Sequence, residues 1–186
     1  MAAEAWEREF WGAVLTVLEM QDESLESWLG AEDSKAPAKI IEQAEEALEW
    51  AVKDRIARCK EDFEQRYQDR NKRSQVLEKS KEFQFWNWPE YRQLAGDGVD
   101  KHDCPACSAT GMLSGTLWNE EVSDDVDPDD PTSEWVDQTY VVEEFLCPTC
   151  TLHLFGTNEA RAGELPEEFT KSEVRERDFG PEYGND

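Results

Sequence analysis

The chain has 186 residues, which is enough for one medium-sized domain or two small ones. It carries 44 acidic residues against 19 Lys and Arg, a formal net charge of −25, so most of its surface repels nucleic acid and anionic membranes and attracts basic partners. No stretch approaches the roughly 20 apolar residues of a membrane-spanning helix, and residues 1–10 lack the pattern of a secretory signal. We therefore expect a cytoplasmic protein with no membrane partner.

Two helical segments are expected first. Residues 3–29 place apolar side chains at helical spacing up to Gly30, a residue favoured just past helix ends. A longer helix is predicted over residues 38–88, because no Gly or Pro interrupts them and apolar side chains from Ile41 to Tyr67 recur at steps of three or four. We interpret the pair as an antiparallel helical hairpin, and a homodimer seam is the alternative. Cys59 falls on the apolar stripe and is expected to be a small buried hydrophobe.

The second helix contains the basic part of the chain. Residues 53–81 hold ten Lys and Arg against six acidic residues. Such a stretch can contact phosphates, and binding to nucleic acid would then depend steeply on salt. The residues proposed for this anion contact are Lys53, Arg55, Arg58, Lys60, Arg66 and Arg70.

An aromatic segment and a turn follow the helices. The segment FQFWNWPEY, residues 83–91, should end the helix before Pro89, and its rings either cap the helical core or form a docking patch. Residues 95–100, AGDGVD, predict a turn-rich connector and a domain boundary.

Four of the five cysteines form two tight pairs. Cys104 and Cys107 form one Cys-Pro-x-Cys motif, and Cys147 and Cys150 form the other. Two such pairs supply the four thiolates of a tetrahedral zinc site, and an odd total of cysteines argues against a disulfide framework. We predict that these four residues bind one Zn²⁺, with iron as the alternative metal.

The two motifs resemble the knuckles of the zinc-ribbon family, with Ser108 where many ribbons carry Gly. The resemblance covers residues 101–156 and implies a small antiparallel β fold and a metal, without implying an activity. The spacer of 39 residues between the pairs is longer than usual. Strands are predicted at 111–122 and 135–146, with a third at 151–155, because these segments are rich in β-branched and aromatic residues.

The predicted metal role is structural, and no catalytic residue is proposed. Four thiolates leave no open position for a reacting water. The sequence lacks the phosphate-binding, dinucleotide-binding and nucleophile-elbow motifs. His102 and His153 are the two histidines, and we expect neither to replace a cysteine ligand. The protein is therefore predicted not to be an enzyme.

An acidic loop, residues 119–134, separates the two central strands. It lacks the Gly and the final Glu of a calcium-binding EF-hand loop. We expect it to be solvated and to dock a basic protein partner, with weak divalent-metal binding as an alternative. The candidate partner-binding residues are Asp124, Asp125, Asp127, Asp129, Asp130 and Glu134.

These inferences together predict an α+β protein with three parts. Residues 1–95 form the helical domain, 96–160 the zinc ribbon, and 161–186 an acidic, partly disordered tail. The expected function is that of a non-catalytic adaptor with an acidic surface for a basic partner, acting as a homodimer or an accessory subunit of a larger complex. The alternative is a nucleic-acid-linked regulatory or bacterial defence factor that contacts phosphates through residues 53–81.

Overall fold

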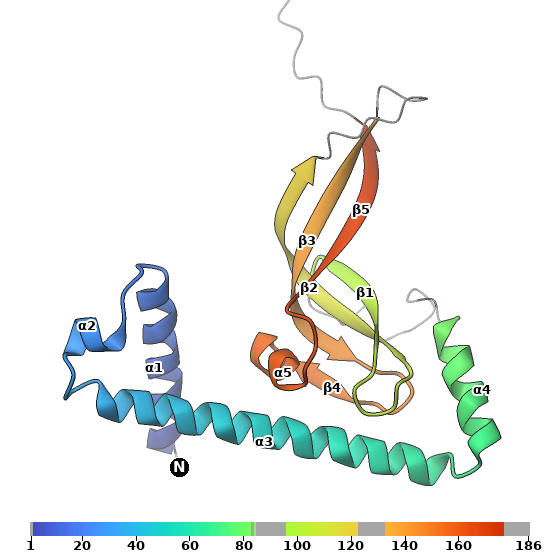
Figure 1. The fold of residues 1–186 in the computed structure, drawn as a ribbon, viewed down its shortest axis with the longest axis horizontal. Helices are drawn as coiled ribbons and strands as arrows, with labels where there is room; N and C mark the ends of the chain where they lie inside the picture. The colour runs from blue at the N-terminus through green and yellow to red at the C-terminus, as the bar shows by residue number, and fades with distance from the viewer. Residues whose placement is uncertain (1, 83, 85–95, 123–132, 177–186) are drawn as a thin grey trace, which may run out of the picture. The chain divides into compact units, whose positions relative to one another are not determined.

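The computed structural model describes residues 2–82, 84, 96–122 and 133–176 (Figure 1). The chain divides into two compact units, Met1–Asp54 and Arg55–Asp186. The division lies inside the long helix α3 (Lys35–Arg66), whereas we expected a boundary at residues 95 and 96. The physical reason is that Arg55 and Arg66, in the second half of α3, hydrogen-bond to Glu159 and Thr149 of the second unit.

The first unit contains α1 (Ala2–Glu19), α2 (Leu25–Leu29) and the beginning of α3. A capping box starts α2, since Ser24 Oγ accepts from the Ser27 N–H at 3.1 Å and Ser27 Oγ accepts from the Ser24 N–H at 2.9 Å. Gly30 ends the helix with a positive φ of 86°. The predicted helices are confirmed, but α1 runs across the direction of α3 in Figure 1, so the antiparallel hairpin is not.

The predicted helix over residues 38–88 is interrupted after Arg66. A new helix, α4 (Arg70–Lys81), begins behind Asp69, whose Oδ1 accepts from the Asn71 N–H at 2.8 Å. The guanidinium of Arg73 donates to the carbonyl of Tyr67 at 3.2 Å and so satisfies one orphaned group at the end of α3. The break needs no Gly or Pro, because an Asp N-cap supplies the alternative hydrogen bonds.

The second unit contains an antiparallel sheet with β3 at its centre (Figure 1). One edge of β3 (Ser133–Leu146) pairs with β2 (Thr110–Val122), which in turn pairs with β1 (Gly98–Asp103). Two strands share the other edge of β3. Residues 144–146 of β3 pair with β4 (His153–Phe155), and residues 133–141 pair with β5 (Glu168–Glu176). A short helix, α5 (Thr157–Ala162), follows β4. The register between β2 and β3 shifts at two irregularities, Ser114/Gly115 and Leu117/Asn119.

The strands confirm some sequence predictions and correct others. The expected strands at 111–122 and 135–146 match β2 and β3 to within two residues. The predicted connector is wrong from residue 98 onward, where β1 begins, and the predicted loop 119–134 is shortened by strands that reach Val122 and resume at Ser133. Within the predicted tail, residues 168–176 form β5, which completes the edge of β3 that β4 leaves open.

The core of the second unit lies beside the cysteines. Met112, Leu113, Phe145, Leu152 and Leu154 are almost completely buried, and all belong to the strands and turns that carry the cysteine pairs. Gly111 permits this packing, since a Cβ at that position would lie 2.5 Å from the ring of Phe145. Among the described helices, none has the length and apolar composition that crossing a membrane requires.

Candidate metal centre

Two turns with the same hydrogen-bonding pattern present the cysteines. The turn between β1 and β2 carries Cys104 and Cys107, and the turn between β3 and β4 carries Cys147 and Cys150. In each turn the N–H of the first cysteine donates to the carbonyl five residues later, of Ala109 at 2.8 Å and of Leu152 at 2.9 Å. The sheet therefore holds both turns at the same end of the β2–β3 pair.

The residue after each second cysteine has a left-handed backbone. Ser108 has φ 60° and Thr151 has φ 63°, and each N–H donates to the carbonyl of the first cysteine in its turn at 2.9 Å. This conformation costs an L-residue about 1–2 kcal/mol, which glycine would avoid. Ser108 stands where many zinc ribbons carry Gly, and Thr151 has the corresponding position in the second turn.

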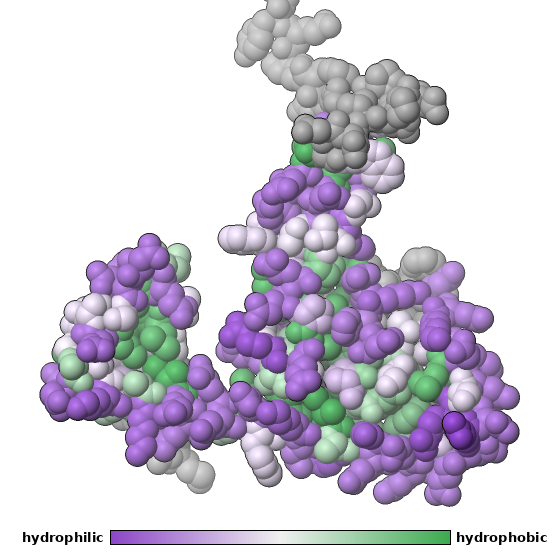
Figure 2. All heavy atoms as spheres, viewed as in Figure 1, coloured by the Kyte–Doolittle hydropathy of each residue, from purple (hydrophilic) through white to green (hydrophobic). Residues whose placement is uncertain are grey.

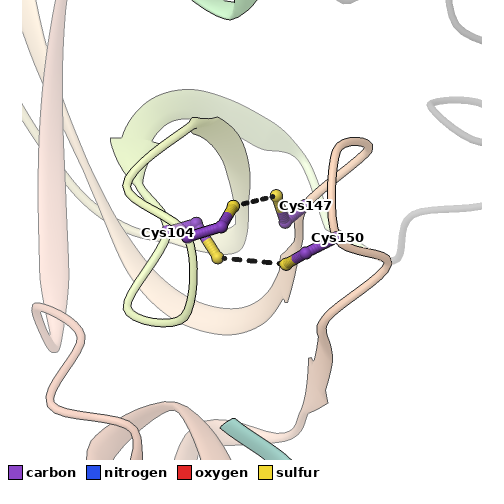
Figure 3. A group of neighbouring side chains, drawn as sticks. Cys104, Cys147 and Cys150 are labelled. Carbon is purple, nitrogen blue, oxygen red and sulfur yellow. Dashed lines mark hydrogen bonds between the residues drawn. The ribbon is translucent and has the colours of Figure 1, made fainter. Parts of the chain in front are cut away.

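The four thiols form one buried group that can hold a metal ion. Their Sγ atoms all lie within 4.8 Å of one another, with Cys104 and Cys150 3.5 Å apart and Cys107 and Cys147 3.6 Å apart (Figure 3). Zinc–sulfur bonds of about 2.3 Å in a tetrahedron place the sulfurs about 3.8 Å apart, whereas a disulfide requires about 2.05 Å. The spacing therefore fits four ligands around one cation, and all five cysteines are free thiols.

The pKa shifts of the four thiols explain why the group favours a bound cation. Hydrogen bonds with Cys104 and Cys107 hold the pKa of Cys147 well below its ordinary value. The pKa of Cys104 lies far above its ordinary value, because of hydrogen bonds with Cys107, Cys147 and Cys150 and because of burial. Four buried sulfurs thus cannot all be thiolates together on their own. A divalent cation stabilises the fully ionised set and releases the shared protons.

Helix α3 packs against the second turn and the elements that follow it. The guanidinium of Arg55 donates to both carboxylate oxygens of Glu159 in α5, at 2.6 and 3.1 Å, and to the carbonyl of His153 at 3.0 Å. Eleven residues further along, Arg66 donates to the carbonyl of Thr149 inside the turn at 3.2 Å. Phe63, on the same helix, is buried. Two of the proposed anion-contact residues are therefore engaged within the chain.

The Arg55–Glu159 pair links three elements. Glu159 also accepts from the N–H of Phe155 in β4 at 2.9 Å. Burial alone would raise the pKa of Glu159, but the hydrogen bonds from Arg55 and Phe155 hold it below its ordinary value. The same hydrogen bond raises the pKa of Arg55. No motif marks this pair, so sequence reasoning missed it, and only opposite charge connects two residues 104 positions apart.

The first turn has its own support from α4. Ser80, near the end of that helix, is buried and accepts from the N–H of Thr110 at 2.9 Å while donating to the carbonyl of Leu77 at 2.7 Å. Thr110 begins β2 directly after the first cysteine pair. Each turn is thus held by one helix, the first by α4 and the second by α3.

The remaining cysteine and the histidines lie outside the four-thiol group. Cys59, on α3, is partly buried, and burial together with the nearby charge of Cys150 raises its pKa. His153 pairs with Glu144, the Nε2 and Oε1 atoms lying 2.5 Å apart. Within the described part of the chain, the group that can hold a metal contains the four cysteines and neither histidine.

The structure describes only some of the other sequence-predicted site residues. Asp124, Asp125, Asp127, Asp129 and Asp130 lie outside the described residues. Glu134 belongs to β3 rather than to a loop, and it accepts from Arg175 Nε in β5 at 2.8 Å. Among the proposed anion contacts, Lys53 pairs with Glu49 at 2.9 Å, while exposed side chains occur at Arg58, Lys60 and Arg70.

No protein-family model matches the chain, and no significant match was found among curated proteins or solved structures. The likeness to zinc ribbons therefore rests on the two Cys-Pro-x-Cys turns and the geometry of their sulfurs.

Proposed function

We propose that this chain is a non-catalytic, zinc-binding interaction protein that uses its acidic surface to dock a basic protein partner. The observation that carries the proposal is the closed set of four thiols, buried at the end of the sheet that they join. Such a set supplies all four ligands of a structural zinc and leaves no position for a substrate. The metal stabilises the scaffold, and the recognition surface lies elsewhere.

The charge of the chain supports a basic partner. Residues 1–54 hold 14 acidic residues against four basic ones, and residues 55–186 hold 30 against 15. The four residues Arg55, Arg66, Arg161 and Arg175 are engaged in hydrogen bonds or ion pairs inside the second unit. The charge that remains toward solvent is therefore mainly negative, which steers positively charged proteins toward the chain.

The alternative, phosphate contact through residues 53–81, has weaker support. Arg55 and Arg66, both in that stretch, direct their guanidinium groups to Glu159 and to the carbonyl of Thr149. An electrophoretic shift assay at low salt tests it directly, and salt-dependent binding that is lost when Lys60 and Arg70 are replaced by Gln would favour the alternative.

Two measurements test the proposal. Metal analysis of the purified protein should give one zinc per chain, and one iron per chain would assign the site to that metal instead. Capture on the immobilised full chain should retain basic proteins that are released as the salt concentration rises, because screening weakens interactions between exposed charges. A catalogue of captured proteins without basic character, retained at high salt, would contradict the acidic docking surface.

A further inference from the structure

An apolar groove lies on the first unit, between α1 and α2. Its volume is about 580 Å³, and its apolar lining comes from Phe10, Ala13, Val14, Val17, Leu18 and Trp28. Figure 2 shows hydrophobic surface gathered on this unit and bounded by hydrophilic residues. The volume falls within the range of about 300–1,000 Å³ that is typical of ligand pockets.

Apart from Leu18, the apolar side chains that line the groove are exposed or half-buried. Val17 is 54% exposed and Trp28 is 57% exposed, although both are large and apolar. Leu18 in α1 and Leu25 in α2, in contrast, are buried. Gathered exposed apolar side chains with a polar rim are a common mark of a binding surface.

The charge around the groove selects its occupant. Four exposed acidic residues follow one another here: Glu19 at the end of α1, Asp22 and Glu23 in the connection, and Glu26 in α2. Glu23 itself lines the groove. A second copy of the chain would bring the same acidic rim against this one, which like-charge repulsion opposes. A segment with an apolar face and basic flanks satisfies both the groove and its rim.

We propose that the α1–α2 groove binds the apolar face of a basic amphipathic helix from the protein partner. The inference rests on the proposed docking function and assigns its site to the first unit rather than to the acidic loop. The lining residues of α1 run from Phe10 to Leu18, roughly 12 Å at 1.5 Å per residue, or about two helical turns. The occupant therefore presents apolar side chains at positions i, i+3 or i+4, and i+7, with Lys or Arg on either side of them.

The test uses a fluorescein-labelled 14-residue peptide with Leu at those positions and Lys elsewhere, titrated with the zinc-loaded full chain. Fluorescence anisotropy reports binding. A scrambled peptide of the same composition keeps the charge and loses the apolar face, and a second control replaces every Lys with Glu. We expect the scrambled peptide to bind at least tenfold more weakly and the Glu peptide not to bind.

The variants Trp28→Ala and Val17→Asp locate the site. Trp28 lines the groove, whereas Trp50 is 71% exposed on α3 in the same unit and does not line it, so Trp50→Ala is the matched control. Trp28→Ala should weaken binding at least tenfold, because buried aromatic anchors dominate interfaces. Val17→Asp should weaken it at least as much, and Trp50→Ala should change it less than twofold. Circular dichroism of each variant verifies that the helical signal is unchanged.

Several outcomes would overturn the inference. Equal binding by Trp28→Ala and Trp50→Ala, equal binding of the scrambled peptide, or no binding of the amphipathic peptide would each exclude the groove as the site. A concentration-dependent dimer in sedimentation equilibrium that Val17→Asp abolishes would assign the groove to a second copy. If basic proteins are still captured in a salt-sensitive way by Trp28→Ala and Val17→Asp, the proposed function stands and the groove assignment alone fails.

Discussion

The two units of the chain place their apolar side chains differently. In the second unit, large apolar residues of β2, β3 and β4 pack completely beside the cysteine turns, and helices α3 and α4 each anchor one turn. In the first unit, the buried aliphatic side chains that the structure describes are Leu18, Leu25 and Val52, while Val17, Trp28 and Trp50 face solvent. The second unit buries its large apolar side chains around the four-thiol group, whereas the first leaves several of its own exposed.

The largest expected effect is the loss of the metal, on which the sheet of the second unit is expected to depend. Cys104→Ser should release the bound zinc and unfold the sheet, because structural zinc contributes about 10–16 kcal/mol, at least as much as the total stability of a typical domain. Cys59→Ser is the matched control and should keep one zinc per chain, since Cys59 lies outside the four-thiol group. Metal analysis and amide hydrogen exchange of β3 measure the two effects. A protected β3 in metal-free Cys104→Ser would show that the sheet does not need the metal.

A second comparison uses neighbouring residues within α1. Leu18 is 7% exposed and Val17 is 54% exposed. Leu18→Ala should lower the free energy of unfolding by about 2–3 kcal/mol, because it leaves a cavity. Val17→Ala should change it by less than about 0.5 kcal/mol, as is usual for surface positions. Chemical denaturation followed by circular dichroism measures both, and equal losses would mean that Val17 belongs to the core rather than to a binding surface.

A third prediction concerns the Arg55–Glu159 pair. Glu159→Gln should lower stability near neutral pH by about 1–2 kcal/mol, a range reduced for the partial exposure of Arg55. The pKa of Glu159 is depressed in the folded state, so its stabilisation is present above the unfolded pKa and is lost as pH falls through the lower, folded value. The difference between wild type and Glu159→Gln should therefore shrink in the acidic range.

Thermal denaturation across a pH series measures that difference. Glu167→Gln is the control, because its ion pair with Arg161 at 3.1 Å is well exposed and should contribute little. If both variants lose the same stability at neutral pH, the contact between α3 and α5 is no stronger than a surface pair.

The smallest effect tests the backbone of the cysteine turns. Thr151 has a left-handed conformation that Gly adopts without strain. Thr151→Gly should raise stability by up to about 1 kcal/mol, since the relief of about 1–2 kcal/mol is partly offset by the greater flexibility of unfolded Gly. The midpoint of thermal unfolding of the zinc-loaded protein measures it. A loss of stability would show that the hydrogen bond from Thr151 Oγ1 to the carbonyl of Cys150, 2.6 Å long, outweighs the strain.

The local features of the metal centre and its strands were predictable from the sequence, because they depend on short-range patterns. The spacing of each cysteine pair and the β-branched residues around 111–122 and 135–146 are such patterns. Contacts over long sequence separations were not predictable. The bond between Arg55 and Glu159 and the pairing of β5 with β3 leave no local signature. The Asp69 cap, in turn, interrupted a segment that contains no Gly or Pro.

The placement of both cysteine turns at one end of the β2–β3 pair has a consequence for strand alignment. Side chains alternate between the faces of a sheet, so a slip of one residue would exchange the buried and exposed sides of β3. A metal bound by the four sulfurs would join residues next to the Met112–Leu146 pairing and so fix which positions oppose one another up to the first register shift, at Ser114/Gly115. At the other edge of β3, Tyr140 is the register partner of Phe169 in β5, and their rings stack with centroids 5.0 Å apart. A metal held by the four cysteines would thus align β2 with β3 at their cysteine end, whereas the β3–β5 register depends on contacts of its own, such as this ring stack.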